Sequence, residues 1–182
     1  MTTARLRPLL PVLLAAACAG PAVAGDIRFF SYDPADEVTR RMTRGVTLEV
    51  EQGLLGGLFG GLQARGLYST SARGSARLDH DGGSPVRAAL PDGAREANVY
   101  RIAPEGDGRA LGRALCPGSD EAWLVMGRLR LNTPLTVHAV GRTGDQPPRH
   151  CVQLSYTFRG EWALPPGDGP ESNDSLAPRL GR

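Results

Sequence analysis

The stretch CVQLSYTF, residues 151–158, alternates strictly between apolar and polar side chains. Its apolar set is Val152, Leu154, Tyr156 and Phe158; its polar set is Gln153, Ser155 and Thr157, continued by Arg159. A period of two places each set on one face of an extended chain. The pattern is typical of a β-strand with one buried and one solvated face.

Two more strands are expected before this one, within the block Cys116–Leu164. Residues 122–131 are apolar on both faces in their first half, which indicates a central strand covered on both sides. Residues 135–140 alternate again, with Leu135, Val137 and Ala139 on one face. Turn-forming residues separate the runs at 117–119, 132–134 and 144–148. The block is therefore predicted to be a three-stranded meander.

Earlier in the chain, strand patterns recur at 26–32, 46–51, 72–79 and 97–103. A short, mostly solvated helix is expected from Asp33 to Arg44, with Asp33 as its N-cap and Pro34 at its first position. Residues 110–115 fit either a helical turn or a strand. The sequence predicts a single, mainly β domain: an antiparallel β-sandwich or half-open barrel with one or two short helices.

The N-terminal residues 1–24 have the features of a secretory signal peptide. Arg5 and Arg7 precede an apolar run from Leu9 to Ala19, and Ala22-Val23-Ala24 is a small-x-small cleavage site. The run is shorter than the roughly 20 residues that span a bilayer. An alternative is a lipoprotein anchored at Cys18. We expect an exported protein, periplasmic or secreted, with a β-rich domain over 25–164 and a disordered tail over 165–182.

Cysteine usage agrees with export. If Cys18 leaves with the signal, Cys116 and Cys151 remain, and an even pair in an exported chain predicts one disulfide. Closing a loop of about 36 residues would contribute on the order of 3–4 kcal/mol in the chain-entropy model. The alternative, a redox or nucleophilic cysteine, lacks a C-x-x-C motif. We expect the disulfide to staple the C-terminal meander.

Charge and composition exclude several functions. Without Arg5 and Arg7, the 21 basic residues become 19, equal in number to the 19 acidic residues. A basic patch for nucleic acid is therefore not expected. The chain contains no lysine, which excludes Schiff-base chemistry and a Walker-type phosphate loop.

The segment Gly53–Leu62 combines glycines with an apolar set at helical spacing: Leu54, Leu55, Leu58, Phe59 and Leu62. Each glycine costs about 1 kcal/mol relative to alanine in a helix interior. Three interpretations remain open: a glycine-rich loop or irregular strand connection, a packed short helix, and an element that contacts a membrane surface or a partner.

No metal, cofactor or catalytic site is predicted. Residues 79–83, DHDGG, resemble the start of a calcium loop, but Leu90 stands where that loop needs glutamate, so a polar turn is expected. The three histidines, His80, His138 and His150, lack ligand spacing, and surface positions are expected for them. The motifs G-x-S-x-G, S-x-x-K, H-E-x-x-H and G-x-G-x-x-G are absent.

Three functions remain open. The first is a non-catalytic exported domain that binds an unknown protein or another envelope component. A second is an envelope surface protein that contacts a membrane or a hydrophobic partner through Gly53–Leu62. The third is a hydrolase whose site is assembled from remote acids and histidines.

Overall fold

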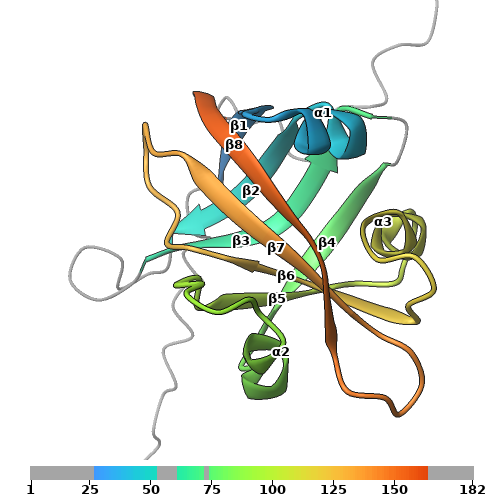
Figure 1. Cartoon of the computed structure of the whole chain (residues 1–182). Coiled ribbons are helices and arrows are strands. Elements are labelled where there is room, and N and C mark those ends of the chain that lie inside the picture. The colour runs from blue at the N-terminus through green and yellow to red at the C-terminus, as the bar shows by residue number, and fades with distance from the viewer. Residues whose placement is uncertain (1–26, 53–60, 72–73, 164–182) are drawn as a thin grey trace, which may run out of the picture.

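The computed structural model describes residues 27–52, 61–71 and 74–163, which form a closed β-barrel (Figure 1). Eight strands follow one another in chain order, each antiparallel to its neighbours, and β8 pairs with β1 to close the barrel. Three short helices connect strands in this part of the chain. The elements are β1 (Ile27–Pro34), α1 (Glu37–Thr43), β2 (Val46–Gln52), β3 (Leu62–Ser69), β4 (Ser75–Asp81), α2 (Ser84–Ala88), β5 (Asn98–Ile102), α3 (Gly108–Leu115), β6 (Glu121–Met126), β7 (Leu135–Arg142) and β8 (Arg149–Ala163).

The predicted mainly β, antiparallel domain is confirmed, but its sheet is a closed barrel rather than a sandwich or a half-open barrel. The long β8 makes closure possible, because it pairs with β7 over its first half and with β1 over its second. Closure satisfies the backbone groups that an edge strand would expose.

Side chains fill the barrel interior. The alternating apolar residues of neighbouring strands meet there, including the buried aromatic side chains of Phe30, Tyr32, Tyr100 and Tyr156. An eight-stranded barrel has an interior just wide enough for its own side chains. The barrel is therefore a packed core, and its chemistry must be sought on the outer surface.

The predicted C-terminal meander is confirmed as β6–β7–β8. As expected, β6 is buried on both faces: Leu124 and Met126 point into the barrel, whereas Trp123 and Val125 belong to a second apolar cluster outside it. Val86 of α2 is part of that outer cluster, so α2 covers β6 from outside.

Helix α1 begins later than predicted. Asp36 is the N-cap and accepts a hydrogen bond from the backbone N–H of Thr39 at 2.8 Å, whereas Pro34 is the last residue of β1. These residues are extended rather than helical because Tyr32, Asp33 and Pro34 continue the pairing of β1 with β8. The helix packs through two threonines, and Thr43 is hydrogen-bonded to the Tyr156 hydroxyl at 3.0 Å.

Three more segments differ from the sequence-based expectation. Residues 79–81 belong to β4 rather than to a turn, and α2 follows directly after Gly83. Residues 62–69 form β3, which was not predicted, while the expected strand at 72–79 begins only at Ser75. The segment 110–115 lies in α3. The predicted signal peptide, most of Gly53–Leu62 and the predicted tail lie outside the described residues.

Candidate functional site

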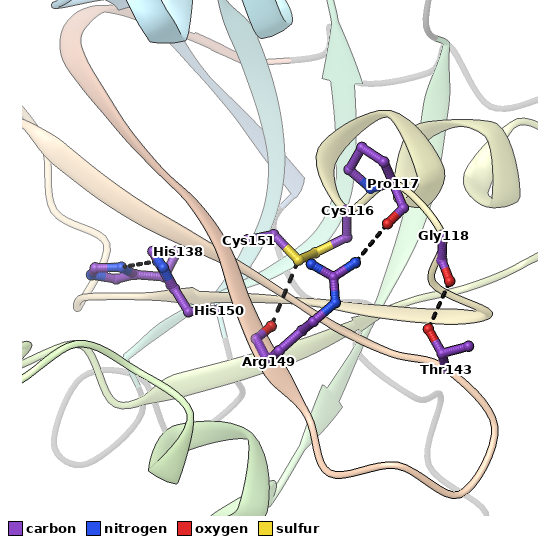
Figure 2. Close-up of a disulfide and its surroundings, with 8 residues drawn as sticks. All are labelled: Cys116, Pro117, Gly118, His138, Thr143, Arg149, His150 and Cys151. Atoms are coloured by element: carbon purple, nitrogen blue, oxygen red, sulfur yellow. Dashed lines mark hydrogen bonds between the residues drawn. A yellow bond between two sulfur atoms is a disulfide. The ribbon is translucent and has the colours of Figure 1, made fainter.

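The disulfide predicted between Cys116 and Cys151 is present, with 5.4 Å between the two Cα atoms. It joins the residue after α3 to the start of β8 (Figure 2). The staple across the meander is therefore confirmed.

A β-bulge at Cys151 sets the direction of its neighbours. Ala139 pairs with Val152 but Val140 pairs with His150, so Cys151 is an extra residue on β8. Without the bulge, alternation from Leu154 would point His150 into the barrel and Cys151 outward. The bulge reverses both directions. Cys151 can then reach Cys116, and His150 lies on the outer face beside Val140.

His138, His150 and Glu96 form a chain of hydrogen bonds on this outer face. His138 Nδ1 lies 3.1 Å from His150 Nε2, and His138 Nε2 lies 3.2 Å from a carboxylate oxygen of Glu96. Figure 2 shows the two histidines on one side of β8 and the disulfide on the other. Since the Glu96 carboxylate accepts from Nε2–H, neutral His138 has a free lone pair on Nδ1, toward His150.

The three hydrogen-bonded side chains are partly shielded from solvent. His138 is 2% exposed, while Glu96 and His150 are half-buried. Burial, and secondarily the neighbouring His138, lower the pKa of His150 below its ordinary value. A surface cavity of about 350 Å³ borders the cluster and is lined by Glu96, His138, Thr136 and Gln153, with the loop 91–95.

The prediction that all three histidines are ordinary surface residues is therefore wrong for His138. His80 belongs to β4 and stacks edge-on against Tyr100, apart from the other two. His138 and Glu96 are 42 residues apart, and they come together because β6 pairs with both β5 and β7 and the loop after α2 leads into β5. The alternation of residues 135–140 placed His138 on the outer face; nothing in the sequence indicated what covers it.

A second feature is a set of exposed apolar side chains on β1, β3 and β8, here named the aromatic face and defined as Ile27, Phe29, Tyr68 and Trp162. Phe29 of β1 lies opposite Trp162 of β8, and its ring centroid is 6.2 Å from that of Tyr68 on β3. Trp162 is 57% exposed, Tyr68 42% and Ile27 41%. The Trp162 indole donates to Ser31 Oγ at 2.9 Å, which fixes the ring against β1.

A polar groove adjoins the aromatic face at Tyr68. It has a volume of about 750 Å³ and lies over β3 and β4, which pair at only three positions. The Tyr68 hydroxyl donates to Glu49 at 2.8 Å on one side of this groove, and Arg77 pairs with Asp79 at 3.2 Å on the other. Exposed aromatic rings therefore stand next to fixed charges.

The remaining predicted site residues are placed as follows. Leu54, Leu55, Leu58 and Phe59 lie outside the described residues, whereas Leu62 begins β3, packs against the core and bridges to Leu129. Asp81 does not begin a metal loop: its carboxylate accepts from the Gly83 backbone N–H and from the Trp123 indole. In the described ranges, no three His, Cys, Asp or Glu side chains converge to hold a metal.

No protein-family model, curated protein or solved structure matches this chain. Among the helices that the structure describes, none is long and apolar enough to cross a membrane.

Proposed function

We propose that this protein is an exported, non-catalytic β-barrel domain that binds an envelope component, most directly through its aromatic face. The observation that carries the proposal is the exposure of Trp162 beside Phe29 and Tyr68 on a barrel whose interior is filled. Contiguous exposed apolar surface marks interaction sites more often than chance placement does. Tryptophan and tyrosine are also the residues most enriched in the energetic centres of interfaces.

The test uses a photo-reactive amino acid at position 162 and, as a matched control, at Val38. Val38 is 54% exposed but lies on helix α1 rather than on the strands that carry the aromatic face. After illumination with a cell-envelope extract, we expect an adduct at position 162 that excess unlabelled wild-type protein suppresses. Unlabelled Trp162→Asp protein should suppress it at least tenfold less well. Equal adducts at both positions, or an adduct that no competitor reduces, would contradict the proposal.

A second candidate is contact with a membrane or a hydrophobic partner through Gly53–Leu62. One observation favours it: Ile27 of the aromatic face pairs with Glu51, close to the start of that segment. Liposome flotation of the wild type and of a Leu58→Asp, Phe59→Asp variant tests it. Flotation of the wild type alone is expected, and equal behaviour of both proteins contradicts this candidate.

The hydrolase alternative is favoured by the cluster of Glu96, His138 and His150 beside a cavity. A carboxylate that orients one imidazole, which in turn contacts a second, is an arrangement that can move a proton. Turnover of simple nitrophenyl esters would be compared between wild type, His150→Gln and the control His80→Gln. A rate lost only in His150→Gln is expected for a hydrolase; equal rates for all three would remove this alternative.

A further inference from the structure

Two imidazole nitrogens of the outer face lie at the separation of two ligands on one metal ion. His138 Nδ1 and His150 Nε2 are 3.1 Å apart. Imidazole nitrogens bind zinc at about 2.0–2.1 Å, so two of them on one ion lie roughly 3 Å from each other. We propose that His138 and His150 form a two-histidine binding site for a divalent transition-metal ion. This inference does not depend on the proposed partner binding.

The other side of His138 has the environment of a metal ligand. Metal-binding histidines usually donate their second ring nitrogen to a carboxylate, which fixes the tautomer and raises the basicity of the ligating nitrogen. Glu96 supplies that carboxylate at 3.2 Å from Nε2, and the His138 side chain is only 3% exposed. His138 is thus held in the tautomer that leaves Nδ1 free to bind an ion.

His150 can make the adjustment that binding requires. In the hydrogen-bonded pair the ring planes are inclined by 59°. Because the proton of His138 is on Nε2, His150 Nε2–H donates to His138 Nδ1. His150 is half-buried at the start of β8, so its ring can rotate to direct Nε2 toward a shared ion and move its proton to Nδ1.

The ligand set narrows the choice of ion. Imidazole suits Zn²⁺, Cu²⁺ and Ni²⁺ and disfavours Ca²⁺ and Mg²⁺, which prefer oxygen. The affinity order of divalent ions places Cu²⁺ highest. Gln153 lies opposite His138 in the ladder, so its amide oxygen and water are available for the remaining positions.

Calorimetric titration of the protein purified from the exported fraction with Cu²⁺ and Zn²⁺ tests the site. One equivalent of either ion should bind, with Cu²⁺ the tighter, and copper spectra should show nitrogen coupling. We expect His150→Gln to weaken binding at least tenfold and Glu96→Gln to weaken it about 10- to 100-fold, the usual range for a partner behind the ligand. The control His80→Gln should bind as the wild type does.

A second readout separates metal binding from a change in folding. Zn²⁺ should raise the melting temperature of the wild type and of His80→Gln but not that of His150→Gln, whose side chain is half-buried and whose loss the barrel should tolerate. Absence of binding in the wild type would overturn the proposal. So would an equal loss of binding in His80→Gln and His150→Gln.

Discussion

Gly141 allows the turn after α3 to lie close against β7. A side-chain carbon built at this position would overlap Ser119 Oγ and stand 2.8 Å from Cys116 Sγ. Ser119 and Cys116 are themselves buried, so neither can move into solvent. The absence of a side chain at residue 141 therefore lets the disulfide form beneath the turn.

We expect Gly141→Ala to lower the free energy of unfolding by about 1–3 kcal/mol, the usual range for overpacking. Urea unfolding followed by circular dichroism measures it. Gly127→Ala is the matched control, because no atom lies within 4 Å of the added carbon there and its backbone is not left-handed. Equal stability of the two variants would contradict the packing argument.

Asp81 ties the end of β4 to the outer apolar cluster. Its carboxylate accepts from the Trp123 indole N–H at 2.9 Å and from the Gly83 backbone N–H at 3.1 Å. The Gly83 N–H, followed by Trp123, holds the pKa of Asp81 below its ordinary value. Because the folded-state pKa is depressed, this stabilisation is fully present above the unfolded pKa of about 3.9 and is lost as the pH falls through the folded-state value.

Asp81→Ala should therefore cost about 1–2 kcal/mol at pH 7, where a charged acceptor is removed from a partly exposed site. The difference between wild type and variant should shrink as the pH is lowered below 4. Denaturant unfolding at pH 7 and pH 3, monitored by Trp123 fluorescence in a Trp162→Phe background, measures both values. A difference that stays constant with pH would show that the charge of Asp81 is not involved, and Asp92→Ala in an exposed turn serves as control.

Strands whose apolar and polar residues alternate regularly could be predicted from the sequence. β2, β5 and β8 show which side chains face the core, and the doubly apolar β6 shows that it is covered on both sides. β3 could not be read because a register shift opposite Glu49 and Val50 disrupts its alternation around Arg65 and Gly66. The position of His150 could not be predicted for the same reason. Strict alternation would direct its side chain inward, whereas the bulge at Cys151 places it on the outer face.

The disulfide and that bulge belong to one element, the start of β8. We expect the Cys116→Ser, Cys151→Ser variant to be less stable by about 3–4 kcal/mol, because the link spans a sequence separation of 35 residues. Guanidinium unfolding of the variant, and of the wild type with and without reductant, measures the loss. Reduced wild type should match the variant. A loss below about 1 kcal/mol would indicate that packing alone holds the meander together.

For the whole molecule, barrel closure determines where a function can lie. The alternating residues of eight strands meet inside and fill the barrel, so the surfaces left for recognition are outside it. The aromatic face and the histidine cluster are such surfaces. Neither could be predicted from the sequence, because each combines residues from strands or loops far apart in the chain. Exposed Trp162, for example, follows the alternating run of residues 151–158 and gave no local signal of its neighbours.

The central proposal is that this barrel, stapled by the Cys116–Cys151 disulfide, is exported. Its most direct test is the intact mass of the protein recovered from the extracytoplasmic fraction, alkylated without and then with reductant. We expect a chain that begins at Gly25, takes up no alkyl group before reduction and takes up two after it. A full-length chain, or two alkyl groups before reduction, would contradict it.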